Sequence, residues 1–343
     1  MEDFYKRKIE WFQVLRALAA LFIVFEHVRF LQCGLFGVDI FFVLSGFMAV
    51  YSSELNDNHF LLKRIIRIVP FYWLMTIVTF LAILIVPGMF EETTASLPKL
   101  LYSLFFIPFD MNTGSALSAI TNDSVVQPLM RVGWTLNMEM LFYVLFFIAM
   151  KINKRLRALI TSLFIVVLII IGKFVAVPVI NLWSSPLMLE FCIGMALCYL
   201  CAFLSKKQVS GALSKLSAII MLPILIATAL FYRLNKDNFN VHYIFALVAA
   251  VVILLAFLAE RNLNAPKALV NVGNLSFSLY LMHYYIITAL DRFCFDFGEA
   301  TVKAFAGLFI GVLISILVSK LTNEVIEKRL TLFLNKAFTK KID

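Results

Sequence analysis

Long apolar segments recur along this chain and limit what it can fold into. A helix needs roughly 20 apolar residues to cross the hydrocarbon core of a bilayer, and about ten windows of that kind are present. They lie at 11–30, 35–52, 68–87, 135–150, 158–175, 186–204, 214–232, 241–259, 272–292 and 302–321. Because 62% of the residues are hydrophobic, the chain resembles a polytopic membrane protein and not a soluble domain. We predict an all-α fold, one bundle of about ten transmembrane helices.

The basic residues predict the side of the membrane on which each loop lies. If the N-terminus is cytoplasmic, most of the 30 Lys and Arg residues fall in loops on the inner side. This bias predicts that both termini are cytoplasmic. It also accounts for the net charge of +9 without a nucleic-acid partner, and it leaves membrane lipids as partners. We expect a single domain over residues 1–343, with no soluble domain appended.

Three segments need separate interpretation. The outer loop at 88–133 contains the polar run DMNTGSALSAITNDS, which fits either a lid that contacts an acceptor or an ordinary connector. The inner segment HFLLKRIIRIVP (59–70) predicts an interfacial helix leading into the third span, with Pro70 near the start of that span. Cys198 and Cys201 form a C-x-x-C inside an apolar window, and we interpret them as buried small hydrophobes.

Ionisable side chains within the apolar windows are the candidates for function, because charge is costly in a membrane and usually faces a bundle interior or a cavity. Arg16 and His27 lie eleven residues apart in the first window. Eleven residues are close to three helical turns, so both side chains would point the same way, about 16 Å apart along the axis. A histidine at this position can accept or donate a proton near neutral pH.

Other windows add carboxylates at a depth similar to that of His27. By the predicted topology, four acidic residues lie toward the outer side of the membrane: Glu26, Asp39, Glu139 and Glu190. Arg64 and Arg67 lie one helical turn apart at the inner boundary. This layout predicts a cationic mouth that faces the cytoplasm and a centre of acids and histidine nearer the outside.

The cations and Asp39 also have structural interpretations. Arg64 and Arg67 would serve as anchors if their side chains extend to the inner interface. Asp39 would be a structural ion-pair partner if it lies against Arg16 or another cation.

The remaining polar residues divide in the same way. Glu139 would cap or pair structurally, although a lone acid within a span favours function. Glu190 is interpreted as mainly structural, and Glu26 would orient His27 or face a neighbouring span. His283, in the middle of the ninth window, fits a satisfied interior histidine as well as a catalytic one.

Five motifs resemble, in the same order, those of the acyltransferase-3 family, integral membrane enzymes that O-acylate surface glycans and some small molecules. The resemblance runs nearly from end to end. One departure is EKRL (327–330), where the family pattern has a proline in place of Arg329. The motifs are RALAALFIVFEH with Arg16 and His27, GVDIFFVLSGF, KRIIRIVPFYW with Arg64 and Arg67, WTLNMEMLFY with Glu139, and SFSLYLMH ending at His283.

The resemblance implies a cytoplasmic acyl-CoA donor, usually acetyl-CoA, and a hydroxyl of a cell-surface or lipid-linked glycan, such as O-antigen or exopolysaccharide, as acceptor. It implies a multi-pass protein of the bacterial inner membrane, with no permanently bound cofactor and no metal. His27 would be the base or would carry the acyl group itself. The implied catalytic residues are His27, Glu139 and Asp39, the implied donor contacts are Arg16, Arg64 and Arg67, and the further candidates are Glu26, His283, Ser45 and Tyr280.

Two other function classes fit the same pattern of spans. A transporter or flippase of a glycan or metabolite would also have many spans with buried charge. Against it, the sequence has no clear internal repeat and no matching pair of Gly/Pro-interrupted spans. A membrane scaffold without chemistry is the third interpretation. A covalent, donor-dependent change in an acceptor would separate the enzyme from the transporter.

Overall fold

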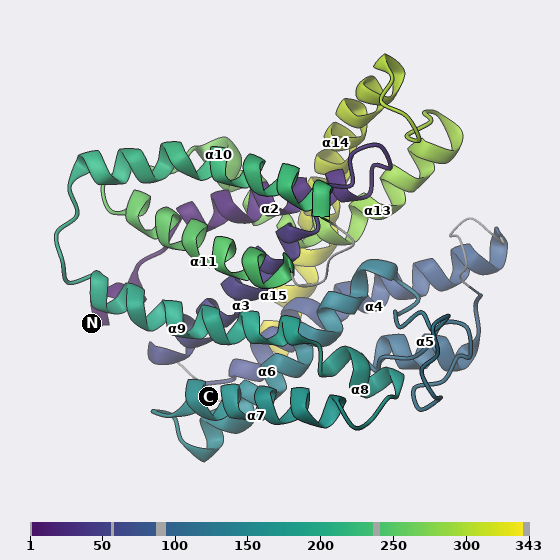
Figure 1. Ribbon diagram of the computed structural model, residues 1–343, viewed down its shortest axis with the longest axis horizontal. Coiled ribbons are helices and arrows are strands. Elements are labelled where there is room, and N and C mark those ends of the chain that lie inside the picture. Colours follow the sequence, from purple (N-terminus) through teal and green to yellow (C-terminus); the bar gives the residue numbers. More distant parts are fainter. Residues whose placement is uncertain (1, 56–57, 87–93, 236–240, 339–343) are drawn as a thin grey trace. The chain divides into compact units, whose positions relative to one another are not determined.

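The computed structural model describes residues 2–55, 58–86, 94–235 and 241–338 (Figure 1). Over these ranges the regular secondary structure is helical, and the only extended pairings are two isolated β-bridges at Asp110. The predicted all-α class is therefore confirmed. A helix pairs its own backbone groups, and lipid demands this because it offers them no hydrogen-bond partner.

The helices follow one another with short connections. Their bounds are α1 Glu2–Lys6, α2 Trp11–Glu26, α3 Phe36–Leu55, α4 Phe60–Ile85, α5 Leu97–Leu104, η1 Arg131–Gly133, α6 Trp134–Ile152, α7 Arg157–Gly172, α8 Pro178–Trp183, η2 Pro186–Met188, α9 Leu189–Leu204, α10 Gly211–Asn235, α11 Val241–Glu260, α12 Lys267–Asn274, α13 Ser276–Phe293, α14 Val302–Thr322, the π-helical η3 Asn323–Glu327 and α15 Lys328–Phe338.

Seven helices in the described part of the chain are long and apolar enough to cross a membrane. Leu163, Ile219 and Phe309, on three different helices, each expose more than half of their surface, as lipid-facing side chains do. The protein is a multi-pass membrane protein.

The predicted count of about ten spans is not confirmed. The windows at 11–30 and 158–175 correspond to α2 and α7, which have only 16 residues each. The window at 272–292 is divided at Leu275 into α12 and α13. The orientation of the termini stays a prediction.

The third predicted span and the segment before it form one helix. α4 runs without a break from Phe60 to Ile85, and Pro70 lies inside it. A proline removes one backbone donor, but membrane helices tolerate it where neighbouring groups satisfy the freed carbonyl. Arg64 and Arg67 are therefore on the spanning helix itself and not on a separate interfacial helix.

The chain forms two compact units, and each is described by itself. Unit 1 comprises Met1–Asn56 and Ile193–Val325, and unit 2 comprises Asp57–Cys192 and Ile326–Asp343. In unit 1, α2 packs against α3, α11, α12 and α13, while α10 packs on α11 and α14 on α13. In unit 2, α4 packs against α5, α6 and α15, and α6 packs on α7. The single domain expected from the sequence stays a prediction.

Glycines allow neighbouring helices to approach α2 closely. A Cβ atom on Gly273 of α12 would lie 1.9 Å from the Gln13 carbonyl oxygen of α2. A Cβ atom on Gly37 of α3 would lie 2.6 Å from the Ala19 carbonyl oxygen. Both distances are far below van der Waals contact, so only glycine fits at these two crossings.

The polar outer loop in unit 2 folds around Asp110. Its side chain accepts hydrogen bonds from the backbone N–H groups of Val125 (2.9 Å) and Asn112 (3.2 Å). Burial acts to raise the pKa of Asp110, but these bonds and those from Thr113 outweigh it and hold the pKa below its ordinary value. From residue 94 onward the loop is thus an ordered, hydrogen-bonded structure. The part of this predicted loop at 88–93 lies outside the described residues.

Candidate active site

Two histidines from opposite ends of the chain meet in unit 1. His27 follows the last residue of α2, and His283 lies in the middle of α13. The Nε2 atom of His283 is 3.2 Å from the Nδ1 atom of His27, and the two rings meet edge to face with centroids 4.8 Å apart. His283 is fully buried, whereas His27 is partly exposed. The structure thus joins the predicted base to a residue that the sequence left undecided.

Backbone carbonyls fix the tautomers of both rings. Nδ1 of His283 lies 3.0 Å from the Leu279 carbonyl, and Nδ1 of His27 lies 2.9 Å from the Ile23 carbonyl. A carbonyl oxygen only accepts, so each Nδ1 carries the proton and donates it. Nε2 of a neutral His283 is then an acceptor for the Nδ1–H of His27. The same assignment makes Nε2 of His27 the basic nitrogen of the pair.

Aromatic side chains of α13 surround the two imidazoles. The ring of Tyr284 meets that of His27 edge to face, with centroids 5.3 Å apart. The ring of Tyr280 lies 5.9 Å from that of His283, also between centroids. Tyr280 was a candidate from its motif, and the structure places it beside the pair. Packing of this kind limits ring rotation, so it helps to hold the hydrogen-bonded geometry.

Glu26 organises the turn that follows α2. Its Oε2 atom accepts hydrogen bonds from the backbone N–H groups of Gly34 (2.8 Å) and Leu35 (3.1 Å), just before α3 begins. Its Oε1 atom accepts a bond of 3.3 Å from the Tyr232 hydroxyl. The carboxylate therefore stabilises the N-terminal approach to α3, where helix N–H groups favour a negative charge. This geometry gives Glu26 a structural role in shaping the turn that carries His27.

The first predicted span is corrected here. It was expected to continue to residue 30, but α2 ends at Glu26 and the chain turns. His27 is therefore the C-terminal cap of α2, with its backbone N–H bonded to the carbonyl of Val24, and not a residue within a longer helix. The turn occurs because the Glu26 side chain reaches forward to Gly34 and Leu35.

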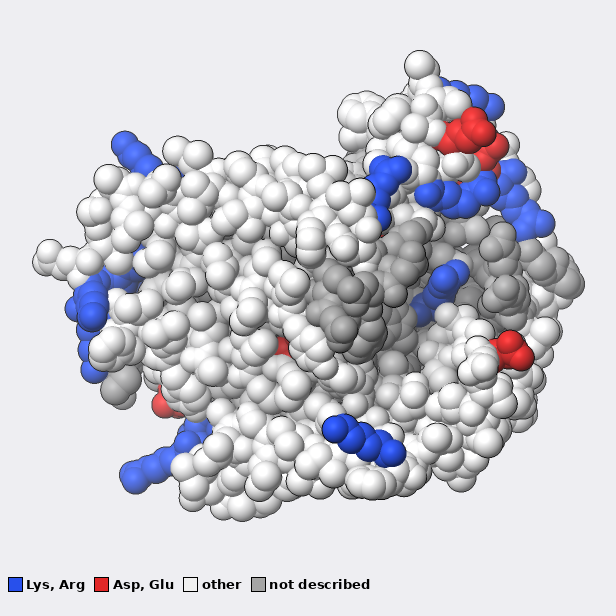
Figure 2. All heavy atoms as spheres, viewed as in Figure 1, with Lys and Arg blue, Asp and Glu red and all other residues white. Residues whose placement is uncertain are grey.

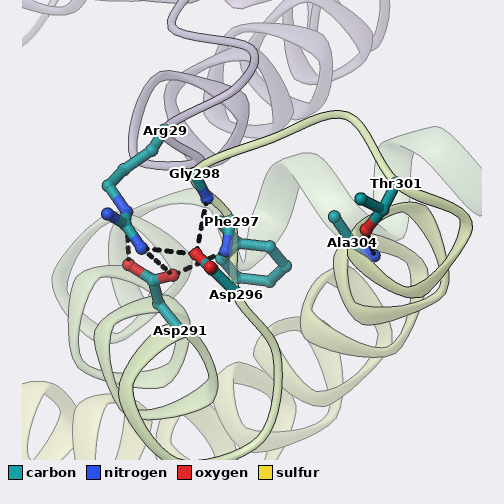
Figure 3. A network of polar contacts seen from close by, with 7 residues as sticks. All are labelled: Arg29, Asp291, Asp296, Phe297, Gly298, Thr301 and Ala304. Atoms are coloured by element: carbon teal, nitrogen blue, oxygen red, sulfur yellow. Dashed lines mark hydrogen bonds and ion pairs between the residues drawn. The ribbon is translucent and has the colours of Figure 1, made fainter.

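An ion-pair network lies directly beyond His27 (Figure 3). The Arg29 guanidinium binds Asp291 of α13 through Nε (2.9 Å) and Nη2 (3.0 Å), and Nη2 also reaches Asp296 (2.8 Å). The two carboxylates in turn accept hydrogen bonds from the backbone of Phe297 and Gly298. This two-pronged contact fastens the end of α2 to α13, the helix that carries His283.

Apolar packing supports the same junction. A buried cluster joins α2, the turn after it, α13 and α14, and it includes Val24, Val28, Leu279, Ile287 and Ala304. Val24 and Val28 flank His27 in the chain, and Leu279 is the residue whose carbonyl accepts from His283. The backbone positions of both histidines are therefore set by close packing, since a shift of either helix would open a cavity.

Three other predicted residues of unit 1 occupy different environments. Asp39 is buried in the first turn of α3, with 2% of its surface exposed. Arg16 on α2 and Ser45 on α3 are half-buried. Their roles toward the donor or the acceptor stay predictions.

In unit 2, Arg64 and Glu139 share one tyrosine. The Arg64 guanidinium carbon lies 5.1 Å from the ring centre of Phe60 and 5.4 Å from that of Tyr143. The Tyr143 hydroxyl donates a hydrogen bond of 2.7 Å to Glu139. Cation–π contact and partial burial hold Arg64 against the protein, unlike an anchor whose side chain extends to the interface. Arg67 is exposed.

This arrangement corrects part of the predicted layout. Arg64 was expected at the inner boundary and Glu139 toward the outer side. The structure brings the cation and the acid to opposite sides of the same tyrosine side chain. Glu190 is buried in the first turn of α9, and its structural role stays a prediction, as does the approach of Arg64, Arg67 and Glu139 to His27.

Comparison with known proteins identifies the family. A family model described as an acyltransferase domain matches residues 9–320, which is nearly the whole chain. The chain belongs to this acyltransferase family. The motif resemblance found in the sequence is thereby confirmed.

Two relatives of this acyltransferase act as reference points. The exopolysaccharide production protein ExoZ of Rhizobium meliloti is 31% identical over 266 residues, which cover 76% of this chain and 78% of ExoZ. The O-acetyltransferase OatA of Staphylococcus aureus is 24% identical over 310 residues, which cover 81% of this chain and 50% of OatA. The chain thus aligns with about half the length of OatA. No solved structure gave a significant match.

Sequence reasoning missed several residues around this acyltransferase site. Tyr143 follows Glu139 by four positions, the spacing at which helix side chains meet, so that pair was detectable. Tyr284 follows His283 directly, and Arg29 lies two residues after His27. No local pattern links Arg29 to Asp291, because they are 262 positions apart.

The arrangement in unit 1 supports proton transfer. A partly exposed imidazole presents a basic nitrogen, and its other nitrogen donates to a buried second imidazole. Within the described residues, no group of three or more His, Cys, Asp or Glu side chains is placed to hold a metal ion.

Proposed function

We propose that this protein transfers an acyl group, in the first instance acetyl, from acyl-CoA to a hydroxyl of a cell-surface or lipid-linked glycan. The acceptor class is suggested by the names of ExoZ and OatA. The proposed location is the bacterial inner membrane, with the donor reaching the enzyme from the cytoplasm. The observation that carries the proposal is the fixed tautomer of His27, which reserves Nε2 for a substrate proton.

His27 is the general base in this proposal. Its Nε2 atom removes the proton of the acceptor hydroxyl while that oxygen attacks the carbonyl carbon of the thioester. The new C–O bond forms, the C–S bond breaks, and the thiolate of coenzyme A leaves. The proton on Nε2 then passes to the thiolate, which returns His27 to its starting tautomer. Direct transfer requires the donor carbonyl and the acceptor oxygen to lie about 3 Å apart.

His283 positions His27 and stabilises its charged form. When His27 gains a proton, its Nδ1–H becomes a stronger donor toward Nε2 of His283. The Leu279 carbonyl holds His283 in the accepting tautomer. This relationship follows the logic of a catalytic triad, in which a third group orients the base, with an uncharged imidazole in the orienting role.

Cationic residues would hold the donor. Arg64 and Arg67 would bind its phosphates through charge-assisted hydrogen bonds, and Arg16 would contact it further into the bundle. Glu139 and Asp39 remain the proposed acids of the site. The half-buried position of Arg64 against two aromatic rings supports a preorganised contact for it.

A genetic experiment with chemical readout tests the proposal. Base-labile acyl groups on the surface polysaccharide are measured by mass spectrometry in four strains: wild type, deletion, and deletion complemented with His27→Ala or with His59→Ala as a matched histidine control. We expect an acyl mass to vanish in the deletion, to return with His59→Ala and to stay absent with His27→Ala at equal protein level. Restoration by His27→Ala would overturn the assignment. A fall in total glycan with unchanged acyl content would favour a transporter.

A further inference from the structure

Unit 1 contains a second polar feature at the end of the helices opposite to the histidine pair. Trp11 begins α2 and His27 follows its last residue, so the two termini of this helix separate the two features. A pocket of about 480 Å³ lies beside Trp11, between α1, the end of α9 and the end of α11. Its volume is within the range of pockets that bind small molecules.

The pocket is lined by more positive than negative charge. Its basic side chains come from three separate segments of the chain and are Arg7, Lys8, Lys206 and Arg261, whereas Glu260 is its one carboxylate. Figure 2 shows Lys and Arg side chains gathered at the left edge of the molecule, the end at which Figure 1 marks the N-terminus.

The nearby carboxylates already have partners. Glu260 Oε2 accepts a hydrogen bond of 2.9 Å from the backbone N–H of Trp11, so it caps the N-terminus of α2. Glu10 pairs with Lys8 at 3.4 Å. Gathering the remaining cations around one pocket is unfavourable in the absence of an anion, because like charges repel.

Hydrogen bonds hold the three segments of the pocket in place. The Tyr51 hydroxyl donates to the backbone carbonyls of Phe4 and Arg7, which fixes the turn that carries Arg7. The Arg261 guanidinium donates to the Lys207 carbonyl (3.2 Å), and this ties the end of α11 to the segment after α9. The cations therefore converge through specific contacts and not as loose surface chains.

The base of the pocket is apolar. Phe4 and Phe257 meet edge to face, with centroids 5.8 Å apart, and Ile9 lies beside them. All three side chains are buried. A ligand that fits this lining combines an anionic group with an adjoining apolar or aromatic part.

We propose that this pocket binds a phosphate-bearing ligand. Arginine and lysine are donors without acceptors, and several of them together match the oxygens of a phosphate better than those of a single carboxylate. Two sources share this chemistry. One is the headgroup of an anionic phospholipid, with an acyl chain against the apolar base. The other is a soluble nucleotide phosphate, with its base against the aromatic rings.

Binding measurements on the purified full-length protein test the proposal and distinguish the sources. Arg7→Gln/Lys206→Gln removes two charges from the pocket, and Lys154→Gln/Arg155→Gln removes two from an exposed connection in unit 2. Inorganic pyrophosphate and coenzyme A are titrated calorimetrically in a neutral detergent. Phosphatidylglycerol and phosphatidylcholine are compared by native mass spectrometry of protein from nanodiscs.

We expect the pocket variant to bind one phosphate-bearing probe at least about tenfold more weakly than wild type, while the control variant binds as wild type does. Loss of phosphatidylglycerol alone identifies a lipid site, and loss of coenzyme A or pyrophosphate identifies a nucleotide site. Equal binding of every probe by all three proteins, or no binding by any of them, would overturn the proposal. Acyl transfer is not measured, so this failure would leave the proposed enzymatic function untouched.

Discussion

The Nδ1 atom of His27 lies 3.2 Å from the Nε2 atom of His283, although the two residues are 256 positions apart in the chain. The carbonyls of Ile23 and Leu279 fix both tautomers, so the pair has one hydrogen-bond direction. Nε2 of His27 is the nitrogen left for chemistry. This geometry makes the contribution of each ring nitrogen separately testable.

The first prediction concerns the basic nitrogen of His27. His27→Asn keeps an amide donor near the position of Nδ1 and so retains the bond to Ile23, but it has no basic atom. We expect acyl transfer to fall at least about 100-fold with unchanged protein level. Transfer is measured in membranes with labelled acyl-CoA. Activity within threefold of wild type would remove His27 from the role of base.

The second prediction separates orientation from binding at His283. His283→Asn keeps a donor toward Leu279 but loses the acceptor at Nε2, whereas His283→Gln places an amide oxygen near that acceptor. We expect His283→Asn to lower kcat about tenfold or more, with little change in either KM. Rescue of part of this loss by His283→Gln would show that the accepted hydrogen bond matters. Equal activities of the two variants would indicate a packing role only.

The third prediction concerns donor recognition by Arg64. Arg64→Ala is expected to raise the apparent KM for the donor about tenfold, because one charge-assisted phosphate contact is lost. Lys63→Ala is the matched control, since Lys63 is an exposed cation on the same turn of α4. Initial rates at varied donor concentration provide the measurement. An unchanged donor KM in Arg64→Ala would return this residue to a structural role against Phe60 and Tyr143.

The fourth prediction concerns helix packing against α2. Gly273→Ala would place a methyl group 1.9 Å from the Gln13 carbonyl oxygen, so α12 must move away from α2. We expect a loss of about 1–3 kcal/mol in stability, measured by thermal unfolding in detergent. Gly211→Ala is the control, because nothing lies within 4 Å of the added methyl group. Equal unfolding temperatures for the two variants would contradict the close crossing.

The fifth prediction is a pH dependence of the loop around Asp110. Its pKa is lower in the folded protein than its ordinary value of about 4, so the unfolded loop binds more protons at intermediate pH. The stabilisation by the carboxylate is therefore complete above about pH 4 and disappears as the pH falls through the folded pKa. Limited proteolysis of residues 94–130 should accelerate over that range.

Asp110→Asn provides the control for this loop. The amide cannot titrate, so its cleavage rate should start higher at neutral pH and change little on acidification. A wild-type loop that is cleaved at the same rate above and below pH 4, roughly, would show that the Asp110 charge does not stabilise it.

The sequence by itself determined the class of the protein. Runs of apolar residues are local features, and their length relative to the bilayer is enough to predict helices that span it. The spacing of Arg16 and His27, and the order of the five motifs, placed the chain in its acyltransferase family before any contact was known. His27 was identified because a titratable group in an apolar segment is costly and therefore informative.

Only the tertiary structure decided how these residues are combined. The end of α2 at Glu26 depends on a carboxylate that reaches Gly34 and Leu35, and hydropathy does not record such a bond. The choice of His283 over the other acids and bases of unit 1 as the neighbour of His27 depends on the packing of α13 against α2. Contacts between segments hundreds of residues apart arise from side-chain packing and hydrogen-bond direction, whereas spans arise from local composition.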